Sequence, residues 1–142
     1  MKLLEMGMLS GPETKDVHVV IENMPDAFLT GDLDRFMSFF ADDVVVMPPG
    51  APAVVGIEGF KNMMTEMFSR SERSDGVSIS RDITVVEDWA IEWHEQATTY
   101  TSNETGKSTR QFHKGIWVLR REDGNWKIAR YCWNNAPEVE PV

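Results

Sequence analysis

Two stretches of the chain combine ionisable and aromatic residues at a spacing that could support proton transfer. In the first, Trp89, Ile91 and Trp93 alternate with polar residues, and Glu95 continues the same alternation. Because successive side chains of a strand point to opposite faces, Glu95 is predicted to share an inner face with these apolar residues. A carboxylate there is suited to general base catalysis. The alternative is an acid that is solvated or paired with an arginine.

The second stretch places His113 on one predicted face with Gly115 and Trp117, near the open end of the same cavity. There it could reach Glu95 and form an acid-base pair, or it could simply be half-exposed. The acid and base predicted from these two stretches are therefore Glu95 and His113.

The other reactive side chains are given structural roles. His94 alternates out of the inner face, so it is predicted on the outer face or in a subunit contact. Arg130 is predicted to pair with Glu92 or Glu95, and Cys132 to be a buried, inert thiol. The three histidines and the single cysteine form no cluster with the spacing of a metal site, so we expect neither a metal nor a cofactor.

Charge and composition limit the classes of partner that we expect the chain to bind. The chain has 142 residues and a formal net charge of −9, from 23 acidic and 14 basic residues. This charge would repel a nucleic acid backbone or an anionic membrane. No segment has the length of apolar sequence that spans a bilayer, and the first residues lack the features of a signal peptide. With one cysteine, the chain is expected to be cytoplasmic.

The first half of the chain has helical periodicity. We expect a loose arm over 1–11, and then a helix that starts after a cap at Ser10 and is kinked by Pro25. A short helix over 33–40, a strand over 44–47, a proline-rich turn and a third helix over 57–68 follow. Residues 69–76 are predicted to be a polar link, and Asp42 and Asp43 a solvated turn.

The second half has the alternation of strands. Four runs, within 77–85, 89–97, 116–119 and 126–134, are separated by segments typical of hairpin turns. Helices followed by a mainly antiparallel sheet define an α+β domain, which we place over 12–137 with a tail over 138–142. The sheet is expected to curl around the first helix and enclose a cavity, and a second subunit is expected to cover its other face.

Two segments resemble a known family. The stretch "AFLTGDLDRFMSFFADDVVVMPPGAPAVVGIEGF" and the terminal "DGNWKIARYCWNNAP" resemble the SnoaL-like group of the nuclear transport factor 2-like superfamily, over about residues 13–137. The resemblance implies a cone, in which a curved sheet wraps around helices and a mostly apolar pocket, commonly in homodimers. It also implies that Tyr131, Trp133 and Asn135 of the last strand face inward. Tyr131 could then donate to a substrate oxygen and complete a catalytic set of Glu95, His113 and Tyr131, although a tyrosine with a satisfied hydroxyl in the core fits equally well. The superfamily includes ketosteroid isomerase, dehydratases, hydrolases, polyketide cyclases and non-catalytic association domains.

The resemblance also implies where an isomerase would carry its catalytic groups. The positions of the proton-moving aspartate, the tyrosine and the second aspartate fall on Pro48, Met24 and Gly115. None of these residues moves a proton, so known steroid-isomerase chemistry is excluded. The segment Val44–Gly56 is therefore predicted to form a rigid apolar rim of the cavity.

Two functions stay open from the sequence alone. One is a cofactor-independent isomerase, cyclase, dehydratase or hydrolase that acts on a small apolar molecule resembling a polyketide, a terpenoid or an aromatic compound. The other is a non-catalytic module for ligand binding, dimerisation or assembly. In both, the ligand is expected to contact Met24, Phe28, Met47, Trp93, Trp117, Trp133 and Asn135.

Overall fold

The computed structural model describes residues 12–137, in which helices come first and a curved sheet follows. The predicted arm over 1–11, the cap at Ser10 and the tail over 138–142 lie outside the described residues. In chain order the elements are α2 (Pro12–Thr30), α3 (Leu33–Met37), β1 (Phe40–Met47), β2 (Val54–Val55), α4 (Ile57–Arg70), β3 (Ser71–Val86), β4 (Trp89–Ser102), β5 (Ser108–Glu122) and β6 (Asn125–Ala136).

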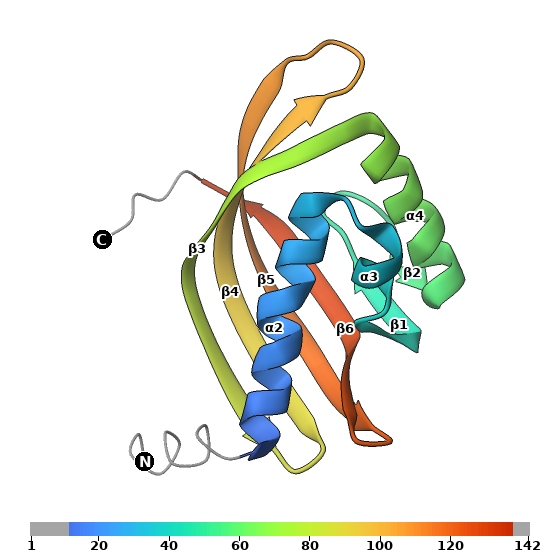
Figure 1. The fold of residues 1–142 in the computed structure, drawn as a ribbon, viewed down its shortest axis with the longest axis vertical. Coiled ribbons are helices and arrows are strands. Elements are labelled where there is room, and N and C mark those ends of the chain that lie inside the picture. The colour runs from blue at the N-terminus through green and yellow to red at the C-terminus, as the bar shows by residue number, and fades with distance from the viewer. Residues whose placement is uncertain (1–11, 138–142) are drawn as a thin grey trace.

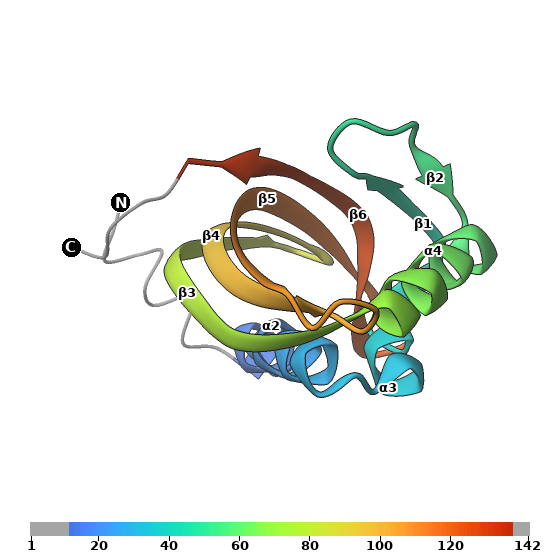
Figure 2. The ribbon, with the colours of Figure 1, turned by 90° about the horizontal axis from the view of Figure 1, so that it is seen from above.

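The strands form one sheet in the order β2-β1-β6-β5-β4-β3. β1 and β6 are parallel, and every other neighbouring pair is antiparallel. The sheet curves, and α2 lies along its concave side while α4 lies beside β1 and β2 (Figures 1 and 2). The predicted α+β cone is confirmed.

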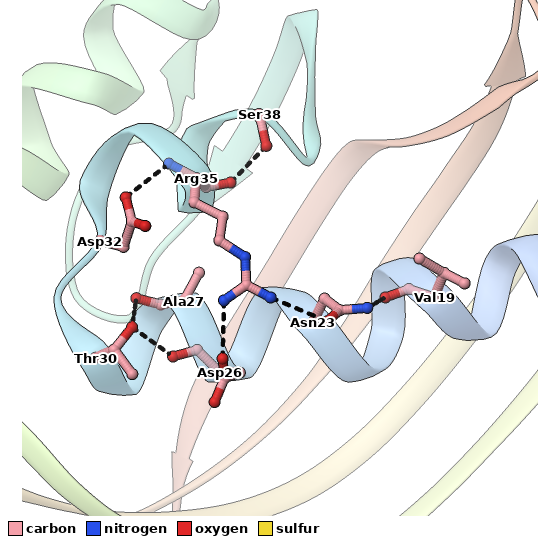
Figure 3. A network of polar contacts seen from close by, with 8 residues as sticks. All are labelled: Val19, Asn23, Asp26, Ala27, Thr30, Asp32, Arg35 and Ser38. Carbon is pink, nitrogen blue, oxygen red and sulfur yellow. Dashed lines mark hydrogen bonds and ion pairs between the residues drawn. The ribbon is translucent and has the colours of Figure 1, made fainter.

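A polar corner fixes the first two helices against each other (Figure 3). Gly31 turns the chain with a φ of 77°, and Asp32 then caps α3 by accepting from the backbone N–H of Arg35 at 3.1 Å. The guanidinium of Arg35 donates back to Asp26 at 2.8 Å and Asn23 at 2.9 Å on α2. Asp32 thus caps α3, and Arg35 ties α3 to α2.

Three predicted boundaries are wrong. The polar link over 69–76 is instead the end of α4 and the start of β3, which begins at Ser71. β3 is an edge strand with one neighbour, so its polar side chains can face solvent without losing the ladder hydrogen bonds. The second helix ends at Met37, because Phe40 already pairs with Ile128 of β6. The predicted turn at Asp42 and Asp43 is part of β1, with both side chains exposed.

The direction predicted for the side chains of β4 is also wrong. Trp89, Ile91 and Trp93 are 46%, 52% and 44% exposed on the convex face, whereas Glu92 and His94 are 0% and 2% exposed on the concave face. The alternation is as predicted, but alternation does not determine which set faces inward. Glu92 and His94 can face inward because the Glu92 carboxylate pairs with Nδ1 of His94 and with Nε of Arg81.

A bulge in β6 changes which of its alternating side chains point to the concave side of the sheet. Leu119 of β5 pairs with Ile128 and Val118 pairs with Arg130, so Ala129 is an extra residue. Ile128 before the bulge and Tyr131 after it therefore both reach the concave side. This explains how two residues of opposite parity in the sequence share one face.

The convex face carries an apolar patch with no covering element among residues 12–137. Four of its members lie side by side across β4, β5, β6 and β1, because Trp93 pairs with Ile116, Ile116 with Cys132, and Cys132 with Met47. Each of the four is exposed. We call these four residues, together with Trp89 and Ile91, the convex patch.

Candidate functional site

The concave side of the sheet and the helices enclose a cavity of about 330 Å³. Its volume lies in the range of small-molecule sites. The helical side of the wall is mostly apolar, with Glu22 of α2 as its one acidic residue, and it includes Met24 and Phe28 of α2, Phe36 of α3, and Phe60, Met64 and Met67 of α4. Flexible methionines and aromatic rings suit an apolar ligand of irregular shape.

The sheet side of the wall is polar, and the strand register explains why. Ser78, Gln96 and His113 are directly paired across β3, β4 and β5. In the adjoining row Arg81 pairs with His94, and His94 with Gly115. We call Ser78, Arg81, Gln96 and His113, which line the cavity, together with Glu92 and His94 behind them, the polar block. It places hydrogen-bonding groups at one end of an apolar cavity.

Glu92 is the centre of a buried ion-pair network. One carboxylate oxygen lies 2.7 Å from Nδ1 of His94, and the other lies 3.3 Å from Nε of Arg81. Neither Glu92 nor His94 has more than 2% of its surface exposed. Charges are buried at low cost only when they are paired, and here one carboxylate serves two partners. Arg81 extends from this network to the cavity wall.

His113 is 7% exposed and lines the cavity with Tyr100, whose ring meets its imidazole edge-on at 6.1 Å. Burial lowers the pKa of His113 below its ordinary value, and the neighbouring His94 lowers it further. His113 is therefore neutral at neutral pH. A neutral imidazole in a closed apolar site can accept or donate a proton.

Two phenols and one indole add donors to the wall. Burial raises the pKa of Tyr100 to about 12 and raises that of Tyr131 above its ordinary value, so both keep their protons at neutral pH. Trp117 packs edge-on against Tyr131 at 5.9 Å, and its indole N–H interacts with the Tyr131 hydroxyl, which lowers the pKa of Tyr131 against the larger effect of burial. An oxygen of a ligand could accept from these groups.

The structure brings together part of the set predicted from the sequence. Met24, Phe28, His113, Trp117, Tyr131 and Trp133 all line the cavity. Glu95 is not among the lining residues and accepts from Ser80 at 2.8 Å. Trp93 and Met47 are exposed on the convex face, and Asn135 is exposed next to His113 beyond the cavity. The inward placement predicted for Glu95, Trp93, Met47 and Asn135 is wrong, because the facing of β4 is inverted and Met47 and Asn135 lie outside the cavity wall.

The most polar part of the site was missed from the sequence. His94 was predicted on the outer face, and Arg130 was predicted to pair with Glu92 or Glu95, but Arg130 instead donates to the carbonyls of Asp43 and Ala129. Cys132, predicted as buried, is exposed. The available signal was that Glu92, His94 and Gln96 alternate as regularly as the tryptophans do. A continuous polar stripe along a strand is as compatible with a polar cavity wall as with a solvated face.

The residues that the structure describes contain no group of three or more histidine, cysteine or acidic side chains arranged to hold a metal ion. Within the same range, no helix is both long and apolar enough to cross a membrane. The polar groups of the cavity wall are imidazole, carboxylate, guanidinium, phenol, indole, hydroxyl and amide groups.

Comparison with solved structures identifies the class of fold. A ketosteroid isomerase-like protein from Erwinia carotovora atroseptica is 25% identical, with 90% of this chain and 99% of that chain covered and a TM-score of 0.77. A candidate dehydratase of the NTF2-like family from Streptomyces avermitilis is 15% identical, with coverage of 87% and 96% and a TM-score of 0.78. The fold is therefore that of the nuclear transport factor 2-like proteins.

A candidate calcium/calmodulin-dependent protein kinase II association domain from Xanthomonas campestris has the same fold, with 21% identity, 92% of each chain covered and a TM-score of 0.76. Comparison with curated protein sequences gives no significant match. The SnoaL-like domain family matches residues 21–131, and the chain belongs to this family. The resemblance seen in the sequence is confirmed.

Proposed function

We propose that the protein is an enzyme that carries out cofactor-independent proton transfer on a small, largely apolar molecule, as an isomerase, dehydratase, cyclase or hydrolase. The observation that carries this proposal is the division of the cavity, with apolar helices on one side and the polar block on the other. The apolar side would hold the ligand skeleton, and the polar side would face its reacting group.

His113 and Tyr131 are the cavity-lining groups proposed for the chemistry. The neutral imidazole of His113 would take or return a proton, and the Tyr131 hydroxyl would donate to the substrate oxygen on which charge develops. Glu95, the base predicted from the sequence, is replaced in this proposal because it lies outside the cavity wall. Structures described as isomerase-like and dehydratase proteins share the fold and support the reaction class.

The experiment uses 2-tetralone, a small aromatic ketone, in deuterated water. Exchange of the hydrogens beside its carbonyl, followed by proton NMR, reports proton abstraction in the cavity. We expect catalysed exchange by the wild-type protein, and a loss of about 100-fold in His113→Asn and in Tyr131→Phe. Glu95→Gln should retain the wild-type rate, and its inactivation would restore the original assignment of the base.

A second candidate function is a ligand-binding or assembly module without catalysis. The convex patch favours it, since large exposed apolar patches mark interaction sites, and a candidate association domain shares the fold. A thermal shift with 2-tetralone in the absence of any exchange would favour this function. Both candidates are compatible with a homodimer, which we propose to form through the convex patch.

We also propose a reducing, cytoplasmic location for the protein. The support is the single Cys132, whose thiol is exposed and has no second cysteine in the chain with which to form an intramolecular disulfide.

A further inference from the structure

His94 lies directly behind the cavity wall. Its imidazole is 2% exposed, and its centre is 4.8 Å from that of Trp117 and 6.5 Å from that of Tyr131, both of which line the cavity. The register pairs His94 with Arg81 on one side, and Arg81 also lines the cavity. The ring is thus bordered by the wall on several sides although it is almost inaccessible to solvent.

Glu92 determines which nitrogen of His94 carries the proton. Its carboxylate lies 2.7 Å from Nδ1 and, through its other oxygen, 3.3 Å from Nε of Arg81. A guanidinium is a permanent cation, so the carboxylate that forms an ion pair with it is ionised and can only accept a hydrogen bond from His94. Nδ1 of His94 is therefore the protonated nitrogen. In the neutral ring, Nε2 then carries a free lone pair.

The nitrogen Nε2 of His94 is buried next to a glycine. It is buried and has no hydrogen-bond partner among residues 12–137. Across the strand pair lies Gly115, where a Cβ would come within 3.1 Å of Nε2 and of Cβ of Trp133, and within 2.9 Å of the Cys132 carbonyl. A larger residue at this position would crowd the imidazole. A buried acceptor without a donor costs free energy, so its retention points to a donor that arrives with the ligand.

We propose that Nε2 of His94 is a second base at this site, which contacts the ligand in addition to His113, with Glu92 as its positioning residue, and that the ligand carries an acidic hydroxyl, a phenol or an enol. This inference rests on the proposed function, because it requires a ligand in the cavity. Gly115 lies between Nε2 of His94 and Trp133, and Trp133 stacks with Tyr131 in the cavity wall at 4.4 Å between ring centres, so this is the part of the wall nearest to Nε2.

The transfer itself balances within the site. The proton of the ligand hydroxyl passes to Nε2, and the electron pair of the O–H bond remains on the ligand oxygen. The imidazolium so formed lies against the Glu92 carboxylate at 2.7 Å. This arrangement matches the general rule that a carboxylate behind an imidazole fixes its tautomer and stabilises its charged form.

The first test needs no ligand. Nitrogen-15 NMR of the histidine rings distinguishes protonated from unprotonated nitrogens, and we expect His94 to show Nδ1–H with a bare Nε2 while the ring is neutral. In Glu92→Gln this preference should weaken, because an amide can also donate, whereas Glu95→Gln on the same strand should leave it unchanged. A His94 ring with its proton on Nε2 would overturn the inference.

The second test compares two probes of similar shape, 4-nitrophenol and 4-nitroanisole, of which only the first has a hydroxyl proton. At a pH where free 4-nitrophenol is neutral, we expect it to bind about tenfold more tightly than the ether and to show the absorbance of its ionised form. His94→Asn keeps a nitrogen near Nδ1 for Glu92 but removes Nε2. It should bind both probes equally and leave the phenol neutral, while His18→Asn on α2 behaves as wild type.

The outcomes separate this inference from the proposed function. If the wild type binds both probes equally and the phenol stays neutral, or if His94→Asn retains the ionised band, His94 is not a base at this site, although the cavity remains a ligand site. If neither probe binds, or if filling the cavity with Met64→Trp leaves binding unchanged, the cavity is not the binding site and both proposals fail.

Discussion

The two faces of β4 differ in both burial and polarity. On the concave side, Glu92 and His94 are fully buried and paired, and on the convex side Trp93 and Ile91 are about half exposed. The usual expectation of apolar residues inside and charged residues outside is therefore reversed on one strand. The reversal is possible because the buried Glu92 carboxylate is paired with His94 and with Arg81. The exposed aromatic residues, in turn, can be covered by a second molecule.

The largest effect is expected from truncating a large residue of the concave face. Trp117 is 1% exposed and packs against His94 and Tyr131, so Trp117→Ala should lower the free energy of unfolding by about 4 kcal/mol. Trp93→Ala on the convex face, studied by urea unfolding at dilute concentration, should cost less than about 1 kcal/mol. Equal losses in the two variants would contradict the distinction between the faces.

The next effect comes from the ion-pair network. Glu92→Ala leaves Arg81 and His94 without their shared partner, and we expect a loss of about 3 kcal/mol in the free energy of unfolding. Glu95→Ala is the matched variant, since Glu95 is on the same strand but only accepts from Ser80, and its cost should be about 1 kcal/mol. If Glu92→Ala were no worse than Glu95→Ala, the network would not be a stabilising feature of the concave face.

The convex patch should affect association and leave the cavity intact. Ile116 is 48% exposed at the centre of the patch, and Ile116→Asp would place a charge in the proposed dimer interface. We expect the dimer dissociation constant, measured by analytical ultracentrifugation, to rise by about 30-fold or more. Probe binding in the cavity should be retained. A wild-type protein that is monomeric at all concentrations would contradict the proposed interface.

The smallest effect is a pH dependence that arises from His113. Its pKa is lowered in the folded protein, chiefly by burial, from an ordinary value of 6.5. Below that pH the unfolded chain binds a proton that the folded protein does not, so stability falls as the pH decreases from about 6.5 toward the folded pKa. His113→Gln should flatten this loss by up to about 1 kcal/mol between pH 6.5 and 5. A variant as acid-sensitive as the wild type would show that His113 does not cause it.

The fold could be predicted from the sequence to a large extent. Helical spacing before 70, alternation after 77 and the motifs shared with the SnoaL-like family led to the correct order of the helices and of the five longer strands, but not to β2, and to the correct class. These signals are local, or they are carried by contiguous segments, and they do not depend on which way a strand faces. The helical wall of the cavity, including Met24 and Phe28, followed from the same periodicity.

The polar half of the site could not be predicted, because it depends on facing and register. When the wrong set of alternating side chains in β4 is assigned to the concave face, Glu95 is placed in the site instead of His94. The ion pairs of Glu92 with His94 and Arg81 are then not predicted. The bulge at Ala129 changes the parity of β6 within one strand, and nothing in the local sequence marks it. Tyr131 was placed inward correctly only because the resemblance to the family supplied the direction.

The most direct test of the site uses methionine methyl groups as reporters of both faces. Met24, Met64 and Met67 line the cavity, whereas Met47 is 41% exposed on the convex face. With methyl-labelled methionine and 4-nitroanisole, we expect nuclear Overhauser contacts from the probe to the three cavity methyls and none to Met47. Contacts confined to Met47, or no contact with Met24, Met64 and Met67, would contradict a ligand site on the concave face.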